Sequence, residues 1–227
     1  MAKVLIVPDV HGRSFWHKAK DLIHEVDHIV FLGDYLDPYK EEGITFDTAL
    51  EEFNQILQFK EKYSDKVTLL LGNHDMHYVI LDFMDCSRMN YLKRQDLHQL
   101  YQTHLNKFKL MHTIDNKCMF SHAGVYQEWL DSFQITLDEL NDLERFLTDN
   151  WKSLEALSFY RGGYSWVGSC VWADLRESLK HDLLPGFKHI VGHTQLMDKP
   201  YTTTSIACVD VRRCFILNTE TLDITDA

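Results

Sequence analysis

The feature that most constrains this chain is an apolar run, residues 67–71, that stops at a glycine and delivers Asn73, His74 and Asp75 together. Continuous apolar runs of this length predict buried strands of an α/β protein. Four other short runs have the same form, and the polar residues at their ends are Asp9 with His11, Asp34, His122 and His193. Because open α/β sheets bind ligands at the carboxyl ends of their strands, we expect these side chains to lie together at one edge.

The residue types at these run ends are those that bind divalent cations. Imidazole nitrogens, carboxylate oxygens and an amide oxygen are present, without a cysteine thiolate among them. A carboxylate can bridge two cations, and Asp34 lies between the other ligand loops in chain order. We therefore predict a dinuclear metal site. The first ion is assigned to Asp9, His11 and Asp34, and the second to Asp34, Asn73, His122 and His193.

A cation pair of this kind favours phosphoryl chemistry. Two ions about 3.5–4 Å apart activate a bridging water as the nucleophile and steady a phosphoryl group during in-line attack. His74 follows Asn73 but is needed by neither ion, so we predict that it protonates the leaving oxygen as a general acid. Asp37 can hold that imidazole in its donor form. The other histidines are expected to be structural or exposed, including His77, His112, His181 and His189.

Helical periodicity separates the first three apolar runs. Residues 3–71 therefore predict a β-α-β-α-β order with parallel strands and right-handed crossovers. Residues 76–108 predict a helical insert beside the site. Residues 206–211 and 214–217 predict an antiparallel pair of strands that completes a second sheet.

Each run end lies in a short motif, and the motifs in this order resemble the calcineurin-like metallophosphoesterase superfamily. They are Asp9-x-His11-Gly12, Gly33-Asp34-x-x-Asp37, Gly72-Asn73-His74-Asp75, His122 and Gly192-His193-Thr194. The resemblance implies a four-layer α/β/β/α sandwich, and the length and 45% hydrophobic content of the chain fit a single domain over residues 1–227. It also implies two metal ions, with manganese as the first choice and iron or zinc as alternatives. The same ligand assignments follow from it, and His74 with Asp37 becomes the acid dyad.

The sequence departs from the superfamily pattern at two places. Many members end in Gly-His-x-His, whose second histidine binds the first metal, whereas Gln195 stands there in this chain. A single histidine resembles the phosphoprotein phosphatase branch, but Pro38 and Tyr39 replace the arginine with which that branch binds phosphate. We therefore expect a phosphate-binding arginine elsewhere, since a planar guanidinium can bind two phosphoryl oxygens at once. The candidates, in order of preference, are Arg161 and Arg176, followed by Arg13.

Composition narrows the possible functions. A formal net charge of −11 argues against a nucleic-acid partner held through many phosphates. Bound cations would still allow a phosphorylated protein or nucleotide to bind. We predict a metal-dependent phosphoric ester hydrolase that acts on phosphomonoesters, and phosphoserine or phosphothreonine proteins are its first candidate substrates. One alternative is hydrolysis of a dinucleoside polyphosphate or another nucleotide, and a second is a binding protein that keeps the fold without turnover.

The start of the chain and its cysteines bear on location. The first strand begins at residue 3, which leaves no room for a charged leader and a cleavage site. No apolar run approaches the length needed to cross a bilayer. The five cysteines show no CxxC pairing, which fits a reducing cytosol. We therefore expect a soluble, cytoplasmic protein without a membrane partner.

Overall fold

The strand β1 (Lys3–Val7) shows how the sequence builds the layers of this protein, because its side chains alternate between two hydrophobic clusters. Val4 and Ile6 belong to an inner cluster, whereas Leu5 and Val7 belong to an outer one. Successive side chains of a strand point to opposite faces, so an entirely apolar strand has both of its faces buried. The structure is a computed structural model that describes residues 2–227, and two sheets follow this plan.

The two sheets contain six and five strands. The order in the first is β11 (Ile224–Asp226), β10 (Phe215–Asn218), β1, β2 (His28–Phe31), β3 (Val67–Leu70) and β4 (Phe108–Lys109). The order in the second is β5 (Met111–Ile114), β6 (Cys118–Ser121), β7 (Lys188–Val191), β9 (Ile206–Cys208) and β8 (Tyr201–Thr202). Their inner faces pack on one another, since the inner cluster contains side chains from both sheets, among them Val30 and Phe120.

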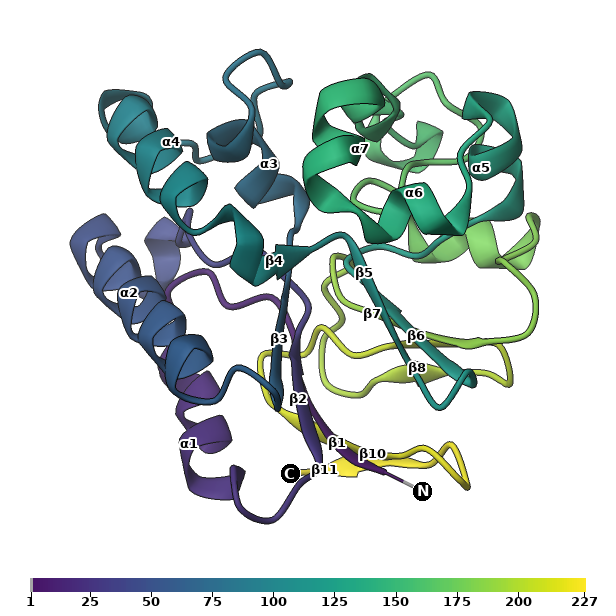
Figure 1. Ribbon diagram of the computed structural model, residues 1–227, viewed down its shortest axis with the longest axis horizontal. Helices are drawn as coiled ribbons and strands as arrows, with labels where there is room; N and C mark the ends of the chain where they lie inside the picture. The colour runs from purple at the N-terminus through teal and green to yellow at the C-terminus, as the bar shows by residue number, and fades with distance from the viewer. Residues whose placement is uncertain (1) are drawn as a thin grey trace.

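The predicted β-α-β-α-β order of residues 3–71 is confirmed. β1 pairs in parallel with β2, and β2 pairs in parallel with β3. The connecting helices α1 (Lys18–Leu22) and α2 (Phe46–Lys62) cover the outer face of the six-stranded sheet (Figure 1). Thr45 caps α2, and its Oγ1 accepts a hydrogen bond of 3.1 Å from the N–H of Thr48.

The remaining helices complete the predicted four-layer α/β/β/α sandwich. α5 (Gln127–Phe133), α6 (Leu137–Asn141) and α7 (Leu143–Asp149) lie on the side of the five-stranded sheet (Figure 1). Trp129 of α5 and Phe146 of α7 share the outer cluster with Met119 of β6. α3 (Asn73–Val79) and α4 (Arg94–Thr103) lie above the six-stranded sheet, and the residues between them contain one short 3-10 helix, Tyr91–Lys93.

The predicted pairing of residues 206–211 with residues 214–217 is wrong. β9 pairs with β7 and β8 in the five-stranded sheet, whereas β10 pairs antiparallel with β1 in the six-stranded sheet. The connection between them crosses from one sheet to the other. Val209 and Phe215 both belong to the inner cluster between the two sheets. Both arrangements bury the same apolar side chains, so the hydrophobic pattern alone does not separate them.

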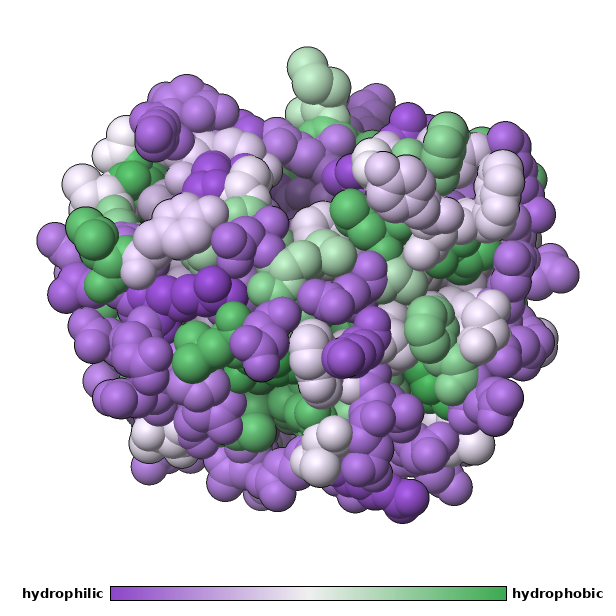
Figure 2. Space-filling view, turned by 90° about the horizontal axis from the view of Figure 1, so that it is seen from above, coloured by the Kyte–Doolittle hydropathy of each residue, from purple (hydrophilic) through white to green (hydrophobic). Residues whose placement is uncertain are grey.

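On the face of the molecule seen from above, apolar side chains lie in small groups between hydrophilic ones (Figure 2). Among the helices formed by residues 2–227, none combines the length and the apolar content that a bilayer crossing requires.

Candidate metal centre

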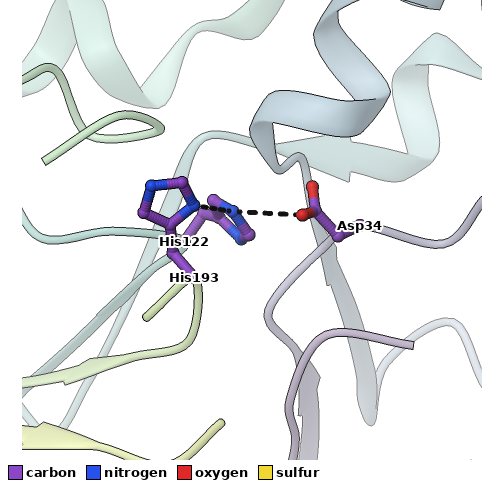
Figure 3. Close-up of side chains that lie close together, drawn as sticks. All are labelled: Asp34, His122 and His193. Carbon is purple, nitrogen blue, oxygen red and sulfur yellow. Dashed lines mark hydrogen bonds and ion pairs between the residues drawn. The ribbon is translucent and has the colours of Figure 1, made fainter. Parts of the chain in front are cut away.

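The five strand ends meet at one buried place between the two sheets. The residues that follow the strands of the first sheet are Asp9 and His11 after β1, Asp34 after β2, and Asn73 after β3. His122 and His193 follow β6 and β7 of the second sheet, and Figure 3 shows both imidazoles facing Asp34. The backbone N–H of His193 reaches the two carboxylate oxygens of Asp9 at 3.0 and 3.1 Å. At this place, two of the predicted ligands therefore join the sheets directly.

The ligand atoms form two groups that share Asp34. The groups are Asp9, His11 and Asp34, and Asp34, His122 and His193. Within each group all ligand atoms lie within 4.8 Å of one another. Oδ2 of Asp34 is 3.4 Å from Nε2 of His11 and 3.6 Å from Nε2 of His122. Oδ1 of Asn73 lies 3.0 Å from the same His122 nitrogen, so the structure brings all six predicted ligands together.

The tautomers of two imidazoles fit a cation at this place. Nδ1 of His11 lies 2.8 Å from the carbonyl oxygen of Leu36, and Nδ1 of His122 lies 2.8 Å from that of Leu32. Because a carbonyl oxygen can only accept, both rings carry their hydrogen on Nδ1 and present a bare lone pair at Nε2. In its neutral form, His122 would therefore face the amide oxygen of Asn73 with a lone pair on each atom, 3.0 Å apart. Converging lone pairs need a cation, and a carbonyl on the far nitrogen is the usual partner of a metal-binding histidine.

Burial shifts the pKa values of the ligands in opposite directions. It raises the pKa of Asp9 and of Asp34 well above their usual range. It lowers the pKa of His11 and of His193 well below the ordinary histidine value. Neutral imidazole is the form that donates a lone pair to a metal, and a cation would stabilise the buried carboxylates in their charged form.

The predicted acid dyad is in contact. Nδ1 of His74 lies 2.9 Å from Oδ2 of Asp37, so the carboxylate accepts the Nδ1 hydrogen. Burial raises the pKa of Asp37, but hydrogen bonds from His74 and His77 outweigh it and leave the pKa lowered. Burial lowers the pKa of His74 to about 4. The ring by itself is therefore neutral at pH 7, and negative charge beside Nε2, such as that of a phosphoryl group, raises its pKa again.

Residues that the sequence analysis did not select hold Asp37 in place. The hydroxyl of Tyr78 donates to its Oδ1 at 2.6 Å, and Nε2 of His77 lies 3.0 Å from its Oδ2. We expected His77 to be structural or exposed, and it is buried against the dyad. Both residues lie on α3, in the same helical segment as His74, so the helix supplies the ring and its support together.

Asp75 ties two ligand loops to each other. Its Oδ2 accepts from the backbone N–H of Asp34 at 2.8 Å and from that of Gly72 at 2.7 Å. Its Oδ1 accepts from the backbone N–H of Tyr35 at 3.2 Å and from the hydroxyl of Tyr101 at 2.6 Å. Asp75 belongs to a motif, but Tyr101 lies on α4 with no motif around it, so only the fold reveals that contact.

The three arginines predicted to bind phosphate are all paired with carboxylates. Arg13 donates to both oxygens of Glu42, at 2.7 and 2.9 Å. Nε of Arg161 lies 2.8 Å from Asp174, and Arg176 donates to the same carboxylate at 2.7 and 3.1 Å. Each of the three guanidinium groups therefore already has a carboxylate partner, and their role toward phosphate stays a prediction.

A fourth arginine, Arg88, lies closer to the dyad and was not selected. Its Nη2 is 3.3 Å from Nε2 of His74, and its Nε donates to the backbone oxygen of Asp37 at 3.0 Å. Its guanidinium carbon lies 3.8 Å from the centre of the Tyr39 ring. Arg88 follows α3 in an irregular segment without periodicity, so no sequence signal marks it.

Left-handed backbone also marks this place. Positive φ angles occur at His11 (45°), Asp34 (54°), Asp37 (58°) and His193 (61°), and Arg88 has the same feature (64°). Residues other than glycine rarely adopt this conformation, and they concentrate where function fixes the backbone. Four of these five residues were predicted from the motifs.

Comparison with known sequences agrees with this geometry. The sequence model described as calcineurin-like phosphoesterase matches residues 2–196. The chain is 27% identical over 152 residues to the serine/threonine-protein phosphatase ppe1 of Schizosaccharomyces pombe. The aligned region covers 63% of this chain and 44% of that protein. It is 31% identical over 81 residues to the serine/threonine-protein phosphatase 4 catalytic subunit of Eremothecium gossypii. This aligned region covers 34% of this chain and 23% of that protein. The chain thus spans less than half the length of these relatives.

Comparison with solved structures supports the fold. A protein serine/threonine phosphatase from Saccharomyces cerevisiae, with similarity to human phosphatase PP5, superposes with a TM-score of 0.60. The superposition covers 99% of this chain and 80% of the other, at 14% sequence identity. At that identity, the likeness is one of fold.

Proposed function

The chain belongs to the calcineurin-like phosphoesterase family, and from that premise we propose that it is a metal-dependent phosphoester hydrolase that acts on phosphomonoesters. The observation that carries the proposal is the pair of ligand groups that share Asp34, with the contact between His74 and Asp37 beside them.

Two metal ions fit the donor atoms of this centre. Asp9, His11 and Asp34 would hold the first ion, and Asp34, Asn73, His122 and His193 would hold the second. When bound, such a pair polarises a phosphoryl oxygen and lowers the pKa of water. Imidazole nitrogens with carboxylate and amide oxygens suit manganese, which is our first choice, and also iron or zinc.

The chain itself supplies the proton for the leaving group. Asp37 holds the Nδ1 hydrogen of His74, so Nε2 is the nitrogen that can face a substrate. A phosphoryl dianion beside Nε2 raises the pKa of the ring, and the protonated ring then delivers its Nε2 hydrogen to the leaving oxygen. Tyr78 and His77 fix the carboxylate, so the ring is oriented before substrate arrives.

Phosphoserine and phosphothreonine proteins are the substrates we propose first. The two relatives described above are named as serine/threonine-protein phosphatases. A nucleotide phosphohydrolase is the alternative, because Phe159 and Trp166 form an exposed stack with ring centres 6.1 Å apart. Arg161, from the same segment, donates to the backbone oxygen of His193 at 3.2 Å, so this segment contacts one of the ligand loops. Aromatic faces of this kind can stack a base.

The first test joins elemental analysis with two generic substrates. Purified protein is expected to hold about two metal ions per chain and to hydrolyse an aryl phosphate faster than an aryl phosphodiester, with manganese added. His74→Asn should lower kcat by roughly 10²–10⁴-fold at unchanged metal content. His181→Asn, a histidine paired with Glu128, is the control and should retain activity. Full activity in metal-free protein would contradict the proposal, and metal-loaded protein without turnover would point to a binding protein.

A second assay separates the substrate classes. Phosphopeptides and a dinucleoside polyphosphate are compared at equal concentration by kcat/KM. Faster cleavage of phosphopeptides supports the first choice. A clear preference for the dinucleotide, lost on Trp166→Ala, supports the alternative.

A further inference from the structure

The guanidinium of Arg88 lies against the ring of Tyr39, two residues after Asp37 of the acid dyad, although the two residues belong to different segments of the chain. We propose that Arg88 is a substrate-binding residue whose guanidinium contacts the phosphoryl group next to His74. This inference rests on the proposed function and names the residue that holds the substrate.

Arg88 differs from the other arginines because its guanidinium does not pair with a carboxylate. In residues 2–227 it is the one arginine without a carboxylate oxygen within 4.0 Å. The side chains with such a partner are Arg13, Arg94, Arg145, Arg161, Arg176, Arg212 and Arg213. A half-buried guanidinium without a carboxylate partner can bind an anion without first breaking an ion pair.

The guanidinium is held in one orientation. Its Nε donates to the backbone oxygen of Asp37, its Nη1 donates to Oγ of Ser87 at 3.3 Å, and Tyr39 supports its face. These contacts leave Nη2 directed at Nε2 of His74, 3.3 Å away. An oxygen that accepts the proton of His74 therefore comes within reach of Nη2. The same anchoring keeps the cost of ordering the side chain low when phosphate binds.

Positive charge is concentrated around the same ring. The guanidinium carbons of Arg13 and Arg212 lie 5.1 and 5.9 Å from the centre of the Tyr39 ring, and both groups pair with Glu42. Three guanidinium groups thus surround one aromatic ring beside the ligands, in a chain with a net charge of −11. Such a cluster of guanidinium groups favours an anionic substrate.

The test measures phosphate binding directly, so that it does not depend on turnover. Inorganic phosphate is titrated into metal-loaded protein by calorimetry, and its metal content is determined in parallel. Arg88→Ala should weaken phosphate binding by roughly 10- to 100-fold, as expected for a lost charge-assisted contact. The phosphate affinity of Arg88→Lys should lie between that of Arg88→Ala and that of the unmodified protein, because lysine keeps the charge but cannot donate two parallel hydrogen bonds as a guanidinium does. Arg145→Ala, which removes an exposed arginine of α7, should bind phosphate within about twofold of the unmodified protein.

The outcomes separate the two proposals. Phosphate affinity in Arg88→Ala equal to that of the unmodified protein, or no phosphate binding by the unmodified protein, would overturn the role of Arg88. Absence of hydrolysis by a protein that binds phosphate through Arg88 would overturn the proposed function alone.

A second pair of variants checks the support of the guanidinium. Tyr39→Phe keeps the ring and should bind phosphate nearly as well as the unmodified protein. Tyr39→Leu removes the aromatic face and should weaken binding by about 2- to 10-fold. Equal affinity in both variants would show that the ring does not position Arg88.

Discussion

The hydrogen bonds of Asp75 give a prediction that can be worked out atom by atom. Asp75→Asn replaces one carboxylate oxygen by an amide NH2 group. If this group takes the place of Oδ1, it meets the backbone N–H of Tyr35 and the hydroxyl of Tyr101. The hydroxyl can turn and accept, but the backbone N–H of Tyr35 cannot.

The magnitude follows from these contacts. A buried N–H left without an acceptor costs about 1–3 kcal/mol. Each remaining hydrogen bond becomes weaker by about 1 kcal/mol, because its acceptor no longer carries a charge. Relief from burying a charge offsets part of this loss. We expect the free energy of unfolding to fall by about 2–5 kcal/mol, a large share of the roughly 5–15 kcal/mol of a typical domain. Tyr101→Phe removes a single donor and should cost about 1.5–3 kcal/mol.

Urea unfolding measures the loss of stability, and elemental analysis measures its effect on the centre. Asp75 joins the loops that carry Asp34 and Asn73, so Asp75→Asn should also lower the metal content. Asp65→Asn, the same change at an exposed site, is the control. A free energy of unfolding of Asp75→Asn within 1 kcal/mol of that of the unmodified protein, with the metal content retained, would refute the reasoning.

Three further predictions concern the centre and its surroundings. A Cβ on Gly192 would overlap Oδ1 of Asp9, so Gly192→Ala should lose bound metal. Gly43→Ala is the control and should keep its metal, because a Cβ at Gly43 meets no atom within 4 Å. Equal metal content in the two variants would count against this geometry. Chelation should lower Tm by roughly 5–11 °C, the effect of removing a ligand at about 100 times its Kd from a chain of this size, and an unchanged melting curve would argue against bound ions. Burial lowers the pKa of His112 to about 4, so the stability it contributes is complete above pH 6.5 and is lost as the pH falls toward 4. In urea unfolding, the stability lost between pH 7 and pH 5 should be about 1–2 kcal/mol smaller in His112→Gln, and an equal loss in both proteins would disprove this.

The sequence indicated much of this architecture because strand and ligand signals coincide. Short apolar runs that end in a histidine or a carboxylate give both the position of the strand and the direction of the side chain. The parallel order of β1, β2 and β3 followed from the same pattern. Asp34 was predicted to bridge the two ions because it lies between the other ligand loops in chain order, and in the structure two ligand groups share it.

Other features depended on contacts between segments far apart in the chain. Tyr101 reaches Asp75 from α4, and Arg88 reaches His74 from a segment without periodicity. The assignment of β10 to the second sheet failed because its alternating side chains suit either sheet equally well. Apolar periodicity identifies buried faces, but it does not identify the partner strand.

The division of the ligands between two sheets has a mechanical consequence. Asp34 stands on one sheet, and His122 and His193 stand on the other, so a cation held by all three would act as a clasp across the interface between the sheets. Substitutions in the inner core that let the sheets drift apart should then appear first as weaker metal retention, before secondary structure is lost. Metal occupancy would thus report how closely the two sheets pack against each other.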